Sequence, residues 1–261
     1  AASKMKKAQN LALSGRPYAE KIAEVVREVV ARVSEEKHPL LKHNLSGKIL
    51  IILISTNKRL CGGLNTNLFR YVNKQFTKEQ LSVTDFVTLG NKGESFVVKS
   101  LFHLTADFSD TTPFTTHIPA LTTLVTDCYL KGEYKEVYVV YNNFINALKQ
   151  EATVKRILPI AELITILDRK EAQKKQLEFK IEPSLDEILD PLLFHYLENL
   201  VRDAVYEAEA SEHSARMIAM KNATENATEL IEVLTLEFNK ARQEKITYEI
   251  SDMVTARLAV E

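Results

Sequence analysis

The C-terminal part of the chain has the apolar spacing of one long helix. From Leu192 to Glu261 it contains neither glycine nor proline, and a helix over that range would extend about 105 Å at ~1.5 Å per residue. Globular helices average roughly 10–14 residues, so a periodic stretch this long indicates a coiled coil. The predicted seam, with Ile246 and Ile250 beside it, consists of Leu189, Leu193, Leu197, Leu200, Ala204, Ala208, Ser211, Ala215, Ala219, Asn222, Asn226, Leu230, Leu234, Phe238, Ala241 and Lys245.

Residues 1–36 carry a matching stripe and offer a partner helix within the same chain. Its members are again three or four apart for most of its length: Met5, Ala8, Ala12, Tyr18, Ile22, Val25, Val29 and Val33. We expect Pro17 to bend or interrupt this helix, because proline lacks a backbone N–H. An ordinary helix bundle is the alternative, but bundle helices have matched lengths and the C-terminal helix is clearly the longer one. Its far end therefore requires cover from another protein.

Between these helices, the pattern of strands and helices alternates. The stretch "GKILIILIST" (47–56) is almost entirely apolar, as expected of a strand buried on both faces. The other predicted elements are strands at 83–90, 133–144 and 152–160, the last of them antiparallel, and a helix near 118–131. This pattern predicts a small, mostly parallel sheet covered on both faces.

The chain is thus expected to have three parts. They are an N-terminal coiled-coil helix (1–36), an α/β domain (37–184) and a C-terminal coiled-coil helix (185–261) that pairs with the first. The α/β domain ends in a polar connector at 168–180.

The stretch "NKRLCGGLNTNLF" (57–69) follows the first strand and raises the possibility of a phosphate-binding loop. Dinucleotide-binding loops have the pattern G-x-G-x-x-G, and P-loops have G-x-x-x-x-G-K-[ST]. The Gly62–Gly63 pair fits neither pattern. Two glycines suit a tight turn that needs a positive φ, and we expect Asn65 and Thr66 to cap the helix that follows. We therefore interpret this loop as structural.

Composition points to no other chemistry. The net charge is −1, so nothing in the overall charge attracts nucleic acid. Cys61 and Cys128 are isolated and are interpreted as small buried residues, and the six histidines never fall at zinc spacing. We predict no catalytic, cofactor-binding or metal-binding residue. Six glutamates of the long helix are interpreted as a solvated face: Glu207, Glu209, Glu212, Glu225, Glu229 and Glu232.

Two further features of the sequence concern membrane insertion and the start of the chain. No apolar run reaches 18 residues, so no helix is expected to insert into a membrane. The chain opens without Met, and its first residues have the pattern of a helix interior. We expect the natural N-terminus to precede Ala1.

Three stretches, taken together, resemble the gamma subunit of the F-type ATP synthases. They are "AASKMKKAQNLALSGRPYAEKI" (1–22), "RLCGGLNTNLF" (59–69) and "ASEHSARMIAMKNATENATELIEVLTLEFNKARQEKITYEISDMV" (210–254), and they occur in that family's order. The resemblance covers nearly the whole chain and is looser between residues 70 and 180.

This resemblance implies a fold and a role. In the family, the N- and C-terminal helices form a long antiparallel coiled coil beside a small Rossmann-like domain. The longer helix enters the bore of the catalytic α3β3 hexamer, while the sheet domain and the epsilon subunit sit on the membrane c ring. The chain would then be a non-catalytic rotor shaft. It would be peripheral on the cytoplasmic face of a bacterial inner membrane, or alternatively on the matrix side of the mitochondrial one.

The resemblance also assigns contact residues. Arg242, Gln243, Thr247 and Glu249 match the region gripped by the β subunits, and Lys4, Met5 and Lys7 match the neck that faces an acidic loop of β. An apolar tip of Ile250, Met253, Val254, Leu258 and Val260 would turn in a hydrophobic sleeve. Phe179 and Glu182 match the foot that faces the c ring and epsilon.

The sequence departs from the family's pattern in one turn. The family usually has Asp-Arg-Gly before the glycine pair, whereas this chain has Asn57, Lys58 and Arg59. The change removes a carboxylate and replaces a small residue by a large one, so the conformation of that turn is left open. The chloroplast form's regulatory cysteine insert is missing, which argues against thiol control of rotation.

Two other functions fit parts of the pattern. One is an α/β nucleotide-binding enzyme that dimerises through its long helices, which tight binding of a mononucleotide by the isolated chain would favour. The other is a coiled-coil scaffold that does not rotate. Self-association that persists when α and β subunits are present would favour the scaffold.

Overall fold

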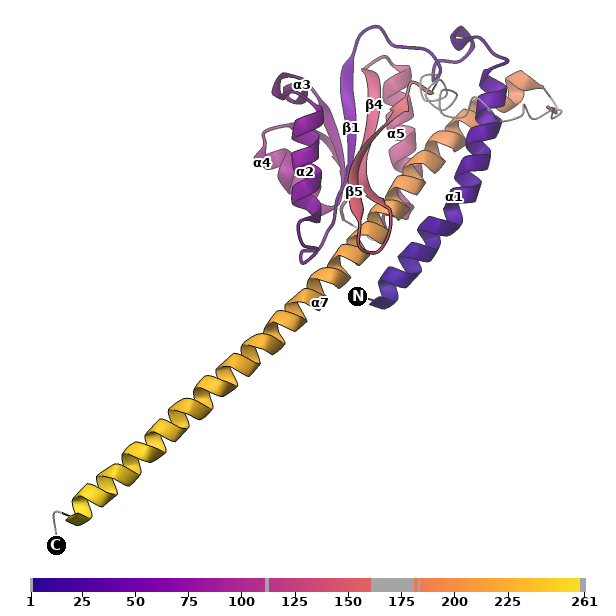
Figure 1. Cartoon of the computed structure of the whole chain (residues 1–261). Helices are drawn as coiled ribbons and strands as arrows, with labels where there is room; N and C mark the ends of the chain where they lie inside the picture. Colours follow the sequence, from indigo (N-terminus) through magenta and orange to yellow (C-terminus); the bar gives the residue numbers. More distant parts are fainter. Residues whose placement is uncertain (1, 111–112, 161–180, 183, 259–261) are drawn as a thin grey trace. The chain divides into compact units, whose positions relative to one another are not determined.

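The computed structural model describes residues 2–110, 113–160, 181–182 and 184–258 (Figure 1). The chain divides into two compact units, unit 1 (Ala1–Met217) and unit 2 (Ile218–Glu261). The elements in chain order are α1 (Ala2–Val30), η1 (Glu35–Lys37), β1 (Lys48–Ile54), α2 (Leu64–Gln75), α3 (Lys78–Ser82), β2 (Asp85–Leu89), α4 (Asn91–Lys99), β3 (His103–Asp107), η2 (Phe114–His117), α5 (Ile118–Leu130), β4 (Tyr134–Phe144), β5 (Gln150–Leu158) and α7 (Leu185–Leu258).

The strands of unit 1 form one five-stranded sheet in the order β3-β2-β1-β4-β5. Strand β1 lies between β2 and β4 and is parallel to both, with Ile51 opposite Phe86 on one side and Tyr138 on the other. Strand β3 extends the parallel part, and β5 pairs antiparallel with β4. The predicted mostly parallel sheet and its antiparallel return are therefore confirmed. The polar edge strand β3 was not predicted.

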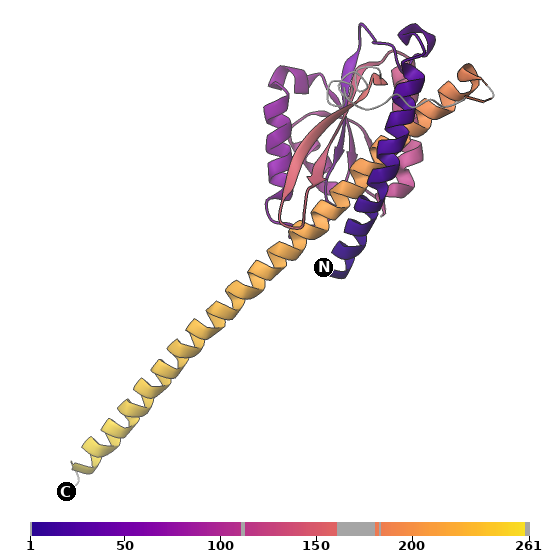
Figure 2. The same cartoon turned by 45° about the vertical axis from the view of Figure 1, so that its right-hand side comes forward.

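Alternate side chains of β1 point to the two faces of this sheet and build two cores. Ile49, Ile51 and Leu53 pack with residues of α2 and α4. The intervening Leu50, Ile52 and Ile54 pack with α5, α1 and the first turns of α7. Figure 2 shows helices on both sides of the sheet. All six side chains are buried because each face of the strand is covered, which explains the continuous apolar run.

Helix α1 runs antiparallel to the first part of α7 within unit 1 (Figures 1 and 2). It continues through Pro17, so the expected interruption is wrong. Ala12 is buried on one side of the proline and Ile22 on the other, and the Arg16 guanidinium donates to the Phe144 carbonyl at 2.7 Å. A proline inside a helix costs about 3 kcal/mol, because it removes a backbone hydrogen bond and its ring clashes with the preceding turn. These contacts offset that cost.

Beyond Pro17, the buried face of α1 shifts by one residue. The predicted Tyr18 and Val25 are exposed, whereas Val26 and Val30 are buried alongside Ile22 and Val29. The two-helix pairing is confirmed, but the predicted stripe is correct for only part of its length.

Helix α7 begins with a capping interaction upstream of Pro191. The backbone N–H of Glu187 donates to Ser184 Oγ at 3.3 Å, and the Ser184 hydroxyl donates to the Glu187 carboxylate at 2.9 Å. This reciprocal pairing satisfies donors at the first turn. The predicted seam is buried from Leu189 to Ala204, and every described side chain of α7 beyond Met220 is exposed.

Gly90 joins β2 to α4 at a position where a side chain cannot fit. Its φ is +105°, and an added Cβ would lie 2.3 Å from the Ser55 carbonyl oxygen. We expect Gly90→Ala to destabilise unit 1 by about 3 kcal/mol or more, from backbone strain plus the clash. Equilibrium denaturation with urea measures this.

Gly132→Ala is the matched control. Gly132 also has a positive φ, +76°, but an added Cβ would meet nothing within 4 Å. Only strain of about 1–2 kcal/mol is expected there. If the two variants lose the same free energy of unfolding, the clash with the Ser55 carbonyl oxygen does not contribute at Gly90.

Candidate interaction surfaces

The sheet order reverses between β1 and β4, which is where doubly wound folds place a ligand. Such ligands bind in a crevice beyond the carboxyl ends of the strands at this switch point. The β1–α2 loop (residues 55–63), which contains the glycine pair, follows β1. The local structure of this loop decides whether a nucleotide could be held here.

The β1–α2 loop is a tight turn held by side chains. Gly62 has a φ of +59° and Leu60 a φ of +68°, so the glycine pair does supply a positive φ as predicted. Helix α2 has Gly63 as its N-cap, with no side-chain cap. The predicted capping by Asn65 and Thr66 is therefore wrong. Asn65 instead accepts from the Thr56 N–H at 3.3 Å and donates to Thr56 Oγ1 at 2.8 Å, because the end of β1 lies within its reach.

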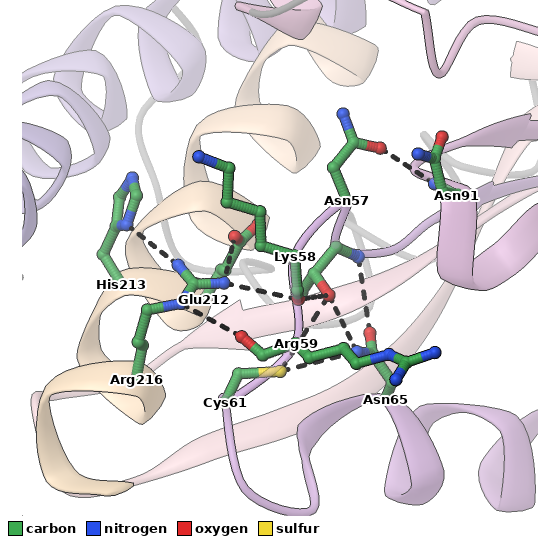
Figure 3. A network of polar contacts seen from close by, with 10 residues as sticks. Asn57, Lys58, Arg59, Cys61, Asn65, Asn91, Glu212, His213 and Arg216 are labelled. Carbon is green, nitrogen blue, oxygen red and sulfur yellow. Dashed lines mark hydrogen bonds and ion pairs between the residues drawn. The ribbon is translucent and has the colours of Figure 1, made fainter. Parts of the chain in front are cut away.

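Helix α7 lies against the carboxyl ends of β1 and β4. Ser211 Oγ donates to the Asn142 carbonyl of β4 at 2.8 Å. Arg216 donates from Nη2 to the Lys58 carbonyl and from Nε to the Arg59 carbonyl, each at 3.4 Å (Figure 3). The chain's own helix thus covers the position where a doubly wound fold would bind a nucleotide. This supports the structural interpretation of the glycine loop.

The structure shows how Asn57, Lys58 and Arg59 are accommodated in the turn where the family usually has Asp-Arg-Gly. Asn57 donates from Nδ2 to the Ser109 carbonyl at 3.1 Å and accepts from the Asn91 N–H at 2.8 Å. A carboxylate could accept the second bond but could not donate the first. Arg59 is not among the residues with a positive φ, so a large side chain is tolerated where the family usually has glycine.

A group of charged side chains lies where α1, the sheet and α7 meet. Arg16 and Glu207 form an ion pair at 3.4 Å. Lys155 of β5 faces Asp203 and Glu207, and burial lowers the pKa of this lysine. Burial also raises the pKa of Asp203 to about 6, while the nearby Lys155 acts in the opposite direction.

Tyr141 of β4 completes this partly buried ionic cluster of Arg16, Tyr141, Lys155, Asp203 and Glu207. Burial raises the pKa of Tyr141, as does its hydrogen bond with Glu207. The cluster therefore joins α1, both strands of the β4–β5 pair and α7.

Three of the predicted solvated glutamates have a different environment in the structure. The side chain of Glu207 is 17% exposed and that of Glu212 is 14% exposed, and burial raises the pKa of Glu209. Only Glu225, Glu229 and Glu232 are on the exposed part of α7 as predicted. The four-residue spacing of Glu212 and Arg216 was the available signal for a local ion pair.

The predicted neck residues lie in the first turns of α1. Lys4 and Lys7 are exposed and Met5 is half-buried. Lys7 also lines a shallow groove along this helix together with Lys6, Asn10 and Leu11. Both ammonium groups are therefore available to an acidic partner.

The predicted contact residues of unit 2 fall on two faces of α7. Gln243, Thr247, Ile250 and Val254 lie within about 60° of each other at ~100° per residue. Arg242 and Glu249 lie together on a second face. All six are exposed, and Glu249 has only a 4.0 Å ion pair with Lys245.

The apolar residues of unit 2 do not form a single stripe. Ile231 and Val233, Leu234 and Leu236, and Tyr248 and Ile250 are pairs two residues apart, and each member is more than half exposed. Residues two apart on a helix project about 160° from each other. Unit 2 therefore presents apolar side chains on opposite sides of its helix.

The remaining predictions are only partly covered by the described residues. Phe179 and Val260 lie outside them, as does the side chain of Leu258, and Glu182 is exposed. Cys61 is buried and Cys128 is half-buried. Among the residues that the structure describes, no three metal-ligating side chains are grouped to hold an ion. No helix there combines the length and apolarity needed to cross a membrane.

The chain matches known proteins over its whole length. The family model described as "ATP synthase" matches residues 1–260. The ATP synthase gamma chain of Desulfitobacterium hafniense is 38% identical, covering 100% of this chain and 90% of its own, and that of Thiobacillus denitrificans is 37% identical, covering 100% and 91%.

Solved structures share the fold. The central stalk and c ring of the Tetrahymena thermophila mitochondrial ATP synthase contains a chain with a TM-score of 0.59 and 24% identity, covering 85% of this chain and 95% of that one. A chain of the Euglena gracilis mitochondrial ATP synthase has a TM-score of 0.60 and 18% identity, covering 100% and 95%.

The raised pKa of Asp203 predicts how the stability of unit 1 depends on pH. The folded state binds the Asp203 proton more tightly than the unfolded state, whose ordinary pKa is 3.8. The contribution of Asp203 to the free energy of unfolding should therefore fall as pH rises from 3.8 to about 6, and level off above. Asp203→Asn should flatten the stability profile in this window, measured by urea denaturation at several pH values.

Asp110→Asn is the control, because Asp110 is an exposed carboxyl in the same unit. Its profile should match that of the unmodified chain. If Asp203→Asn retains the full slope between pH 4 and 6, the assignment of this titration to Asp203 is wrong.

Proposed function

The chain belongs to the ATP synthase gamma-chain family, and on this premise we propose how it works as the central-stalk rotor subunit. The C-terminal part of α7 turns inside the α3β3 catalytic hexamer. Unit 1 is attached to the membrane c ring with the epsilon subunit. Rotation of the ring is thereby coupled to ATP synthesis or hydrolysis in the hexamer.

The observation that carries this proposal is the distribution of apolar side chains on unit 2. A two-stranded coiled coil buries one stripe of each helix, and the opposite side remains polar. Unit 2 instead exposes apolar residues on opposite sides, such as Leu234 and Leu236. A helix of this kind is best covered by a partner that surrounds it. A surrounding hexamer fits this pattern better than dimerisation through the long helices.

The polar contact residues suit a surface that must change partners. Arg242, Gln243, Thr247 and Glu249 are exposed and are proposed to contact the β subunits. Exposed ion pairs contribute only about 0–1 kcal/mol each. Such contacts can break at one β subunit and re-form at the next without trapping the shaft.

Two further contacts with the hexamer are proposed. Lys4 and Lys7, with Met5 between them, face an acidic loop of β at the neck of the shaft. Ile250 and Val254 belong to the tip, where apolar contacts oppose rotation little because they have no preferred direction.

Contacts on the membrane side are also proposed. Phe179 and Glu182 are assigned to the foot that meets the c ring and epsilon. The chain is peripheral, on the cytoplasmic face of a bacterial inner membrane or, alternatively, on the matrix side in mitochondria. It carries no catalytic residue and no cofactor of its own, and the covered switch point in unit 1 supports this.

Reconstitution tests the proposed function. The chain is mixed with α and β subunits, complexes are separated by size, and ATPase activity is assayed with and without it. We expect one chain per hexamer and turnover that depends on its presence. Failure to form this complex, together with tight binding of a mononucleotide by the isolated chain, would favour the enzyme alternative instead.

The double variant Arg242→Ala, Gln243→Ala tests the contact residues. In the assembled complex, it should weaken the coupling of rotation to ATP turnover while the fold is retained, because both side chains are exposed and support no other element. ATP synthesis in membrane vesicles measures this, with circular dichroism as the check on folding.

A second double variant provides the matched control. Lys221→Ala, Glu225→Ala removes an exposed ion pair of 3.7 Å in the same unit, outside the proposed contact region. It should synthesise ATP at the unmodified rate. Unchanged synthesis in the Arg242, Gln243 variant would exclude these two residues as contacts.

A further inference from the structure

We propose that Arg216 is the positioning residue that fixes the angle of α7 about its own axis on the sheet. This inference rests on the proposed function. A rotor must pass torque from its sheet domain into its long helix. Some contact therefore has to prevent α7 from rotating about its own axis against the sheet. The geometry points to the contact between Arg216 and the β1–α2 loop.

The guanidinium of Arg216 is held on two sides (Figure 3). On its own helix, Nη2 donates to the Glu212 carboxylate at 2.6 Å, and Nη1 lies 3.4 Å from His213 Nδ1. Toward the sheet, it donates to the carbonyls of Lys58 and Arg59. The side chains of Arg216 and Glu212 are only 16% and 14% exposed, so solvent screens their pairing weakly.

The loop that receives Arg216 is itself fixed to the sheet. Thr56 Oγ1 donates to the same Lys58 carbonyl at 2.8 Å. Asn65 of α2 bonds to Thr56 and to Cys61 Sγ. Asn57 bonds to the Asn91 N–H and to the Ser109 carbonyl. The loop is therefore tied to α2, to α4 and to the segment after β3, and can bear a load.

The surrounding packing cannot do this alone. The buried residues of α7 near Arg216 are Ala210, Ser211 and Ser214, whose small side chains bury little area. Apolar contact between small residues is non-directional and opposes axial rotation weakly. Ser211 donates to the Asn142 carbonyl, but its hydroxyl lies close to the helix axis. Arg216 extends further from the axis, so the same force on it resists a larger torque.

The position of Arg216 along α7 also matters. It lies within the last turn of unit 1, and unit 2 begins at Ile218 of the same helix. Within the described part of the chain, torque that reaches α7 from unit 2 passes the Arg216 contact before it reaches the Ser211 contact to β4. The backbone carbonyls that accept from Arg216 belong to Lys58 and Arg59, and the contact does not use the side chains of these two residues.

The test compares Arg216→Ala with Arg202→Ala in the assembled, membrane-bound complex. Arg202 also forms an ion pair with a glutamate four residues earlier on α7, Glu198, but no bond from its side chain to the β1–α2 loop is seen. The readout is the number of protons pumped per ATP hydrolysed, which a loss of stability alone would not change. Arg216→Ala should lower this ratio while ATP hydrolysis continues, and Arg202→Ala should leave it unchanged.

Arg216→Lys decides the matter if Arg216→Ala fails to assemble. Lysine keeps the charge beside Glu212 but is a point donor that cannot serve two carbonyls in a fixed fork. It should lower the ratio to an intermediate value. A normal ratio in the assembled Arg216→Ala complex, or in Arg216→Lys where that variant alone assembles, overturns the proposal, as does an equal loss in Arg202→Ala. If ATPase activity of the unmodified complex does not depend on this chain, the proposed function itself fails, which is a separate result.

Discussion

The structure depends on one helix serving two different surroundings. The first turns of α7 complete the core of unit 1, where Leu193, Leu197 and Val205 are fully buried. Beyond Met220 the same helix is exposed throughout its described length. Helices in proteins owe most of their stability to tertiary packing of an apolar face, and isolated helices are marginal in water. The exposed part of α7 has no such packing within the chain, so the buried turns supply most of the stability of this helix. A partner protein that covers unit 2 is the natural complement of this arrangement.

Polar contacts give the packing of α7 its direction. Apolar burial selects which face of the helix meets the sheet, but charged and hydrogen-bonding groups fix its register and its angle. The partly buried ionic cluster, which includes Arg16 and Glu207, joins α1 to α7. Arg216 then ties α7 to the loop that follows β1. A nucleotide-binding fold would leave this loop open for its ligand, whereas here it receives a helix.

The sequence predicted the elements whose apolar pattern is strong. Strand β1 and the buried seam of α7 were predicted because both bury large side chains at a regular period. Strand β3 was missed because this edge strand has two exposed residues, no buried one and no apolar run. The continuous helix at Pro17 could not be predicted either, since contacts far away in sequence compensate for the missing hydrogen bond.

The same limit applies to the candidate contact sites. The four-residue spacing of Glu212 and Arg216 indicates a helical ion pair, but nothing local shows that main-chain carbonyls 157 and 158 residues away complete it. Glu207 and Glu212 look like surface residues in the sequence because charged side chains on a long helix usually are. Their burial depends on the sheet that lies beside them. The contact residues of unit 2 rest on the family resemblance and on their exposure.

Direct observation of rotation tests the central claim most directly. The α3β3 hexamer is fixed to a surface, and a bead is attached to this chain through a cysteine introduced at the exposed Lys131 of unit 1. On addition of ATP, the bead should turn continuously in one direction, at a rate that follows ATP concentration. Steady ATP hydrolysis with a bead that does not turn would contradict the account of this chain as a rotor.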